Sequence, residues 1–303
     1  PSRGLGDVYK RQVFTFDKRI ILGAAVTIKS LIDTAKPETE YDIYVYHPDI
    51  DDKTAQEFAK MCEDTKHSIT FEYISTERFK GAPINKGGSW TEIVYYRLLI
   101  PELLPQYDKV IYADTDVLFK GDLTEAYNID LKDYECAAVA MEPNNENMLC
   151  HKYFPENKNE LTYISSFIIF NSKKMREENF VSRVFDIIKT FNTRLKFFDL
   201  DTLNLACDKI YSLPYRYGVF QSLYYTDDWS TSEEYKFLKN VYSDDTLKHE
   251  VKNVIMLHYA GNPGKPWRRK YIPEDYKAFI ERIPKTLKKY TFRDLRKRLF
   301  SKV

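Results

Sequence analysis

The sequence predicts an α/β protein with a mostly parallel central sheet, and two observations support this fold class. Short β-branched or aromatic segments alternate with segments of helical length, which is typical of parallel sheets covered by helices. The apolar residues 110–113 also run directly into Asp114 and Asp116, and ligands of open α/β sheets bind where strands end. The 303 residues contain no internal repeat or low-complexity linker, so we expect one domain with elaborations.

The individual elements follow from local patterns. Strands are expected where short segments are apolar and rich in β-branched or aromatic side chains, in chain order at residues 13–16, 41–46, 69–73, 110–113, 163–170 and 254–258. Helices are expected at residues 23–32, 51–62, 89–100, 181–192 and 202–209. Ser89 and Glu92 form a capping-box pattern that opens the third helix, and Pro101 closes it. The Gly- and Pro-containing residues 80–88 before it are a candidate lid or a mobile surface loop.

Composition limits the class of protein. The chain is 43% hydrophobic and 30% charged, which is ordinary for a globular protein. Its four cysteines show no C-x-x-C pair and no zinc-like spacing, so a reduced compartment is expected. No apolar segment approaches the roughly 18 residues of a membrane span, and no signal peptide is recognisable, so we expect a cytoplasmic protein.

Residues 1–12 begin without Met and lack apolar periodicity, so we expect a non-native scar outside the fold. The catalytic domain is then expected at residues 13–270, followed by a basic helical tail at residues 271–303.

The charge of the tail differs from that of the remaining chain. Residues 285–303 contain eight basic residues and one acidic residue, a net charge of +7, whereas the whole chain carries +1 and the other residues therefore −6. A uniformly basic surface is absent, so no nucleic-acid partner is expected. Phe292, Leu295 and Leu299 form one helical stripe after Pro284. The tail is therefore expected either to bind anionic lipid on the inner membrane face or to dock on its own core.

Asp114 and Asp116 are the first candidate functional residues. They lie two residues apart at a strand end, where both carboxylates can bind one hard cation. The same spacing occurs at Asp49/Asp51 and Asp199/Asp201, so the spacing alone also fits solvated turn residues. Only Asp114 and Asp116 follow a predicted strand directly, and this position distinguishes them from the other two pairs.

The segment after the last predicted strand provides a second candidate set. His258 can complete a metal site begun by two carboxylates, and a mixed imidazole and carboxylate set favours Mn²⁺ over Mg²⁺. Gly261 and Gly264 allow backbone N–H groups to approach phosphate oxygens. Pro266 favours an extended Lys265, which directs its ammonium toward a diphosphate. Together these residues predict a site for a metal-bound nucleotide diphosphate.

Three motifs in combination carry a family resemblance: the strand ending in Asp114-x-Asp116, the hexapeptide Asp-Leu-Asp-Thr-Leu-Asn at residues 199–204, and His258-x-x-Gly261 followed by Lys265-Pro-Trp267. Over residues 13–267 the chain resembles the family 8 glycosyltransferases. These are retaining enzymes of the GT-A fold, a Rossmann-like and mostly parallel sheet flanked by helices. They include glycogenin and bacterial lipopolysaccharide galactosyl- and glucosyltransferases.

The resemblance implies a role for each matching residue. Asp114, Asp116 and His258 are implied to hold Mn²⁺ or Mg²⁺, and Gly261 and Lys265 to contact the diphosphate. The remaining donor contacts that the resemblance implies are Thr15 and Asp17 at the uridine, Thr115 beside the metal ligands, Arg97 on the capped helix, and Asp199 with Leu200 at the sugar. The implied reaction moves glucose or galactose from a UDP-sugar to a glycan or lipid-linked acceptor in bacterial cell-surface polysaccharide synthesis.

The chain departs from the family pattern at four places. Lys18-Arg19-Ile20 stands where a polar residue and a nucleotide-contacting aromatic are usual, and Leu200 replaces a Gln beside the sugar. Ile164-Ser165-Ser166 replaces Asn-Ala-Gly, and one extra residue separates His258 from Lys265. These departures affect nucleotide contacts and sugar identity, and they leave the metal ligands in place.

Mechanistic alternatives stay open at this level. Leu200 has no nucleophilic atom, which favours attack of the acceptor on the leaving-group face. The alternative is a covalent intermediate, with Asp199 or Asp201 as the nucleophile. The alternative role of both aspartates is to N-cap the helix expected to begin at Thr202. Rival functions are an inverting transferase or nucleotidyltransferase that uses the same metal and diphosphate, and a nucleotide-sugar-binding protein without turnover.

Overall fold

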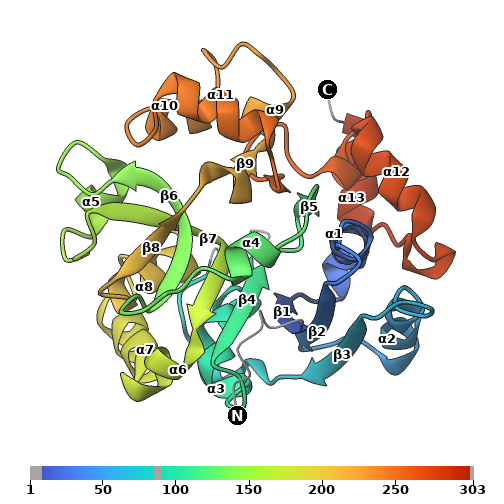
Figure 1. Cartoon of the computed structure of the whole chain (residues 1–303), viewed down its shortest axis with the longest axis horizontal. Coiled ribbons are helices and arrows are strands. Elements are labelled where there is room, and N and C mark those ends of the chain that lie inside the picture. Colours follow the sequence, from blue (N-terminus) through green and yellow to red (C-terminus); the bar gives the residue numbers. More distant parts are fainter. Residues whose placement is uncertain (1–8, 85–89, 301–303) are drawn as a thin grey trace.

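The computed structural model describes residues 9–84 and 90–300 of the chain, and these form two sheets surrounded by helices (Figure 1). The larger sheet has the strand order β3-β2-β1-β4-β7-β6-β8. Its strands are β1 (Tyr9–Thr15), β2 (Glu40–His47), β3 (Ser68–Tyr73), β4 (Lys109–Ala113), β6 (Cys136–Pro143), β7 (Leu161–Asn171) and β8 (Ile210–Leu213). Only β7 runs against its neighbours β4 and β6, so this mixed sheet is mostly parallel, as the sequence predicted.

A smaller sheet lies beside the end of β4. It consists of β5 (Val117–Phe119), β9 (Val219–Phe220) and β10 (Met256–His258). β10 pairs antiparallel with β5 and parallel with β9. A three-residue turn joins β4 to β5, so the chain passes directly from the large sheet to the small one.

Helices cover both faces of the large sheet. The α-helices are α1 (Ile21–Asp33), α2 (Asp52–Ala59), α3 (Ile100–Leu103), α4 (Thr124–Tyr127), α5 (Leu149–Tyr153), α6 (Ser172–Glu177), α7 (Phe180–Thr190), α8 (Asp199–Ala206), α9 (Gln221–Tyr224), α10 (Glu233–Leu238), α11 (Asp244–Lys252), α12 (Glu274–Arg282) and α13 (Phe292–Phe300). The 3₁₀ helices are η1 (Lys18–Ile20), η2 (Thr76–Phe79), η3 (Glu92–Leu99), η4 (Tyr215–Tyr217), η5 (Pro266–Arg268) and η6 (Lys285–Leu287).

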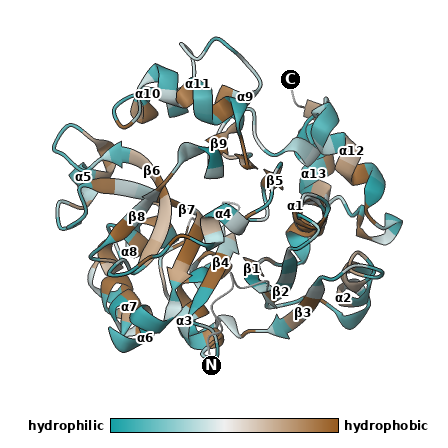
Figure 2. Ribbon diagram, viewed as in Figure 1, coloured by the Kyte–Doolittle hydropathy of each residue, from teal (hydrophilic) through white to brown (hydrophobic). Residues whose placement is uncertain are grey.

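Two hydrophobic clusters form the core, one on each face of the large sheet. Side chains of α1 and α2, such as Ile28 and Phe58, share one cluster with the small sheet and α12. Residues of η3, α6, α7 and α8, such as Leu99 and Val184, form the other. Figure 2 shows hydrophobic residues concentrated on central strands such as β7, whereas α11 and α12 carry many hydrophilic residues.

Several predicted boundaries need correction. β1 begins at Tyr9, because Tyr9, Lys10, Arg11 and Gln12 continue the parallel pairing with β2; these residues were expected to lie outside the fold. Pro101 does not close a helix; it lies in the first turn of α3, where its missing N–H costs no helical hydrogen bond. The preceding segment is the 3₁₀ helix η3, and Ser89 of the expected capping box lies outside the described residues.

The C-terminal part also differs from the expected tail. Tyr276, Ile280, Ile283 and Leu287 belong to the same core cluster as α1, so a boundary at residue 270 divides a continuous core. Pro284 precedes η6 rather than the last helix. Within the predicted helical tail, the amphipathic helix corresponds to α13, which covers Phe292–Phe300. Within residues 9–84 and 90–300, no helix is long and apolar enough to cross a membrane.

Candidate functional site

The candidate site is built on the turn between β4 and β5. Asp114 follows β4 directly, and its N–H donates to the carbonyl of Ser166 on β7 (2.9 Å). The carbonyl of Asp116 accepts from the N–H of Tyr259 (2.9 Å), just after β10. The register of the small sheet pairs His258 with Val117, so the histidine lies beside the turn.

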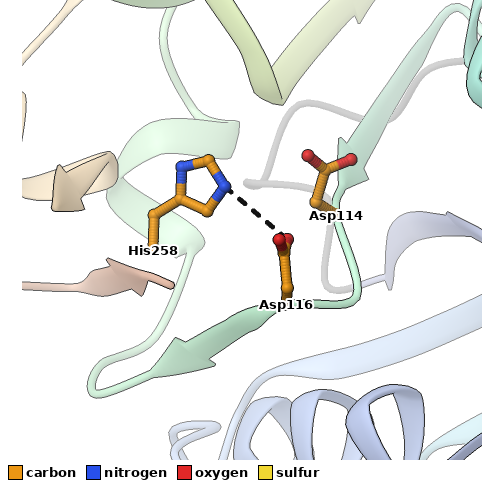
Figure 3. Close-up of side chains that lie close together, drawn as sticks. All are labelled: Asp114, Asp116 and His258. Carbon is orange, nitrogen blue, oxygen red and sulfur yellow. Dashed lines mark ion pairs between the residues drawn. The ribbon is translucent and has the colours of Figure 1, made fainter. Parts of the chain in front are cut away.

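Asp114, Asp116 and His258 converge from these two segments (Figure 3). Each offers one ligand atom, and these atoms lie within 4.8 Å of one another. His258 Nε2 lies 3.6 Å from Asp116 Oδ1. Two carboxylates and an imidazole at this spacing are suited to a divalent cation.

His258 has the protonation state that a metal ligand needs. Its ring stacks on Phe220, with centroids 5.6 Å apart, and the residue is buried. Burial lowers the pKa of His258 to about 4, so the imidazole is neutral near neutral pH. A neutral imidazole has a lone pair available for a cation.

Arg97 is the centre of a buried charge network behind the carboxylates. Its Nη1 lies 2.8 Å from Asp114 Oδ1 and 3.1 Å from Asp199 Oδ2. It also donates to the carbonyl of Ser165 (2.9 Å). Burial opposes the charge of Arg97, but Asp114 and Asp199 outweigh it and raise the pKa of the guanidinium above its usual value. Asp114 is thereby held by Arg97.

Tyr112 supports the same carboxylate from β4. It lies two residues before Asp114 and donates its hydroxyl proton to Asp114 Oδ1 (2.7 Å). The Arg97 guanidinium lies 4.5 Å from the centroid of the Tyr112 ring, and Thr15 Oγ1 lies 3.3 Å from the Tyr112 hydroxyl. The end of β1 is therefore connected to the turn after β4.

Asp199 and Asp201 lie in the first turn of α8, three residues earlier than the predicted helix start. Ser165 Oγ donates to Asp199 Oδ2 (2.6 Å), and burial raises the pKa of Asp199 to about 6 despite the nearby Arg97. The N-cap is Phe198, so neither aspartate has the predicted capping role. Asp201 Oδ2 instead accepts from the N–H groups of Lys196 and Phe197 (2.7 Å each), before the helix. Leu200, between the aspartates, is half-buried.

The loop after β10 contributes Lys265. Lys265 Nζ contacts Asp116 Oδ2 and donates to the carbonyl of Tyr259 (3.2 Å). Burial lowers the pKa of Lys265 to about 8. Gly261 and Gly264 have φ values of +66° and +93°, a region that favours glycine. The conformation of the loop therefore depends on the two glycines that the sequence singled out.

A cavity of about 270 Å³ connects most of the predicted residues. The predicted residues in its wall are Thr15, Asp17, Arg97, Asp114, Thr115, Asp116 and Lys265. Asp199, Leu200, His258 and Gly261 are not part of this wall. The wall also contains residues that the sequence did not indicate as functional: Arg19, Trp90, Thr91, Arg268, Thr291 and Arg293.

Asp17 and Arg19 form one unit at the end of β1. Asp17 is the N-cap of η1 and accepts from the Arg19 N–H (2.9 Å), while the Arg19 guanidinium binds Asp17 Oδ2 (2.6 Å) and Thr91 Oγ1 (3.0 Å). This pairing is local in sequence, so the departure at Lys18-Arg19-Ile20 was the signal that could have revealed it.

The fold and this site define a glycosyltransferase with a GT-A-like structure. The model of glycosyl transferase family 8 matches residues 12–271, and the chain belongs to this family. Members of the family typically use a divalent metal and a UDP-sugar, and membership implies binding of a sugar donor and an acceptor.

Two relatives and one solved structure are similar to this chain over most of their own length. A lipopolysaccharide 1,2-glucosyltransferase from Escherichia coli is 25% identical over 270 residues, which cover 86% of this chain and 74% of the relative. A lipopolysaccharide 1,3-galactosyltransferase from Salmonella typhimurium is 25% identical over 259 residues, covering 84% and 72%. The solved structure of galactosyltransferase LgtC, in complex with donor and acceptor sugar analogs, has a TM-score of 0.72 at 22% identity and covers 91% of this chain and 98% of LgtC. This last similarity is one of fold.

Proposed function

We propose that this protein is a metal-dependent, retaining hexosyltransferase that moves glucose or galactose from a UDP-sugar to a glycan or lipid-linked acceptor. The observation that carries the proposal is the convergence of Asp114, Asp116 and His258 beside Lys265, at the edge of one cavity. The named glucosyl- and galactosyltransferase relatives support the hexose and a role in bacterial cell-surface polysaccharide synthesis.

The three ligand residues would hold Mn²⁺, or Mg²⁺ as the alternative. A divalent cation bound there supplies Lewis-acid stabilisation of the diphosphate leaving group. Lys265 adds a positive charge where negative charge develops on the leaving phosphate, since its ammonium lies next to Asp116. Thr15, Asp17 and Thr115 line the nucleotide part of the cavity in this proposal, and the Gly261 backbone approaches the diphosphate.

Arg97, Asp199 and Leu200 form the sugar side of the proposed site. Arg97 positions Asp114 and Asp199 through its two ion pairs. Asp199 Oδ2 already accepts from Ser165 and faces Arg97, so it is held as a hydroxyl acceptor more than as a nucleophile. Leu200 offers no nucleophilic atom. These contacts support attack of the acceptor on the leaving-group face, with the departing phosphate accepting the acceptor proton.

The last helix supports a membrane-bound acceptor. Phe292, Leu299 and Phe300 of α13 are 83%, 80% and 78% exposed. The surrounding tail is strongly basic. An exposed apolar stripe among cationic side chains suits peripheral contact with anionic lipid, where a lipid-linked acceptor would be found.

A panel of donors tests the function. The full chain is incubated with UDP-glucose, UDP-galactose and their N-acetyl forms, with and without Mn²⁺, and UDP release is measured. We expect Mn²⁺-dependent release from one hexose donor, with the anomeric configuration retained in the product. In a separate incubation with UTP and a sugar 1-phosphate, pyrophosphate release would indicate a nucleotidyltransferase. An inverted product from a UDP-sugar would indicate an inverting transferase. Tight UDP binding without release from any donor would identify a binding protein and refute the proposal.

A further inference from the structure

The donor cavity has a wall that comes from outside the family-matched part of the chain. The family match ends at residue 271, whereas Thr291 and Arg293 line the same cavity as Asp17 and Asp114. Both belong to the segment that leads into and begins α13. This helix packs against η5, which directly follows Lys265. The last helix is therefore next to the candidate diphosphate contact.

A buried ion pair fixes this segment on the body of the protein. Asp294 is 1% exposed, and its Oδ1 lies 2.6 Å from Arg268 Nε of η5. Its Oδ2 accepts from the N–H (2.9 Å) and the hydroxyl (2.7 Å) of Thr291, and the Asp294 N–H donates to Thr291 Oγ1 (3.2 Å). These reciprocal bonds are those of a capping box. Removing one member of a buried ion pair is strongly destabilising, so the position of α13 is well defined.

This docking brings Arg293 to the rim of the cavity. Arg293 immediately precedes the buried Asp294, and it lines the cavity while its side chain stays exposed. The cavity wall contains five cationic side chains, Arg19, Arg97, Lys265, Arg268 and Arg293, against three carboxylates, Asp17, Asp114 and Asp116. Two of these cations, Arg97 and Arg268, also pair with Asp199 and Asp294 outside the wall, so the charges are nearly balanced. The guanidinium groups along the wall offer paired N–H donors to the oxygens of an anionic ligand.

We propose that Arg293 is a donor-binding residue that contacts the phosphates of the nucleoside diphosphate, and that α13 is thus a structural part of the donor site. The proposal rests on the nucleotide-sugar donor proposed above. An arginine can bind phosphate oxygens with two parallel hydrogen bonds, and Arg293 lies at the rim of the cavity. The helix then serves the donor on one side, while its exposed apolar residues lie on the outer surface.

Nucleotide binding measured by calorimetry tests this role with three ligands. UDP, UMP and uridine are titrated, with Mn²⁺ present, into the full chain, the Arg293→Gln variant and the Arg296→Gln variant. Arg296 is the matched control, because it is an exposed arginine of the same helix that does not line the cavity. We expect Arg293→Gln to weaken UDP binding about tenfold, the size of one charge-assisted hydrogen bond, and to leave uridine binding unchanged. Arg296→Gln should bind all three ligands as the unmodified chain does.

The outcomes separate this inference from the proposed function. Equal UDP affinity of the Arg293→Gln variant and the unmodified chain refutes the inference and leaves the proposed function intact. Equal losses of UDP and uridine affinity also refute it, because a displaced helix would affect both ligands. No UDP binding by the unmodified chain refutes both proposals. Arg293→Lys should recover part of the UDP affinity, since it keeps the charge but not the bidentate geometry.

Discussion

Asp114 and Asp116 lie two residues apart but differ in what they contact. Asp114 Oδ1 is fixed by Arg97 and Tyr112, so this carboxylate is part of the buried network. Asp116 instead faces His258 and Lys265. The two carboxylates therefore contribute unequally to stability, although both are proposed to bind the same cation.

Asp116→Asn is expected to abolish sugar transfer while leaving stability nearly unchanged. The substitution removes one anionic ligand, and the electrostatic term at the leaving group is commonly worth several kcal/mol of barrier. Asp114→Asn should abolish transfer too, and it should also lower the free energy of unfolding by about 1 to 3 kcal/mol because Arg97 loses a buried partner. UDP release and urea unfolding measure the two effects. Asp186→Asn, on the outer surface of α7, is the control. Near-normal transfer by the Asp116 variant would contradict the metal site.

Leu200→Gln is expected to change donor preference more than rate. A half-buried leucine beside a sugar offers no hydrogen bond and penalises a hydroxyl next to it. The glutamine should shift the ratio of activities with UDP-glucose and UDP-galactose by about tenfold, the size of one hydrogen bond. The measurement is kcat/KM for both donors. An unchanged ratio would mean that this side chain does not contact the sugar.

The sequence predicted those residues whose position depends on local structure. Asp114 and Asp116 follow a recognisable strand, and Gly261 and Gly264 lie in a recognisable loop, so strand ends and turn chemistry were sufficient to predict where these residues lie; their roles stay predictions. Trp90 and Arg293 reach the cavity only because segments distant in sequence pack together. No local spacing contains that information. For Asp201 the local pattern was misleading. Its position before the predicted helix fitted an N-cap, but its carboxylate accepts hydrogen bonds from the segment that precedes the helix.

The small sheet brings His258 to the carboxylates. An ion pair between Arg216 and Glu250 lies next to this sheet and stabilises it. Glu250 of α11 accepts from the Arg216 N–H (3.0 Å) and binds its guanidinium through both oxygens (2.9 and 2.8 Å). The Arg216 carbonyl in turn accepts from the N–H of Ile255, next to β10 (2.9 Å). Hydrogen bonds from Arg216 lower the pKa of Glu250 to about 2.

This pair predicts a pH-dependent contribution to stability. Because the pKa of Glu250 is lower in the folded state than in the unfolded state, its stabilisation is fully present above about pH 4.5 and is lost as the pH falls toward 2. Glu250→Gln should lower the free energy of unfolding by about 2 to 3 kcal/mol near neutral pH and by less than half of that near pH 3. Urea unfolding at several pH values measures it. Glu233→Gln, in an exposed pair with Lys236, should have little effect. A difference in unfolding free energy between Glu250→Gln and the unmodified chain that does not change with pH would contradict a stabilising role of the ionised Glu250.

At the scale of elements, strand direction was the main feature that the sequence could not supply. An apolar segment such as β7 has the same pattern in either direction, and only the path of the intervening chain makes it antiparallel to β4. The short strands β5 and β9 have three and two residues, too few to show a period. The early helix α1 was recognised because most of its residues are apolar and buried. α2 was recognised although it buries only Thr54 and Phe58.

Over the whole molecule, the charge distribution left two alternatives for the tail, contact with anionic lipid or docking on its own core. The helix α13 docks on Arg268 of the body through its single acidic residue, Asp294, which the surrounding basic residues did not indicate. Docking by a polar residue leaves Phe292 and Leu299 exposed, so the molecule has one apolar and cationic surface at its C-terminal end.

This surface predicts salt-sensitive binding to anionic vesicles. A chain ending at Tyr290 keeps Leu287 in the core but lacks α13, and it should lose co-sedimentation with vesicles that contain phosphatidylglycerol. Each basic residue near such a surface contributes roughly 1 kcal/mol, which added salt should screen. The Phe292→Ser, Leu299→Ser double variant keeps the Asp294 ion pair and should bind vesicles at least about tenfold more weakly, because each apolar side chain is worth more than 1 kcal/mol on burial. Unchanged UDP affinity of the double variant would show that α13 is still docked. Equal pelleting of the full and shortened chains would mean that α13 serves only the body of the protein.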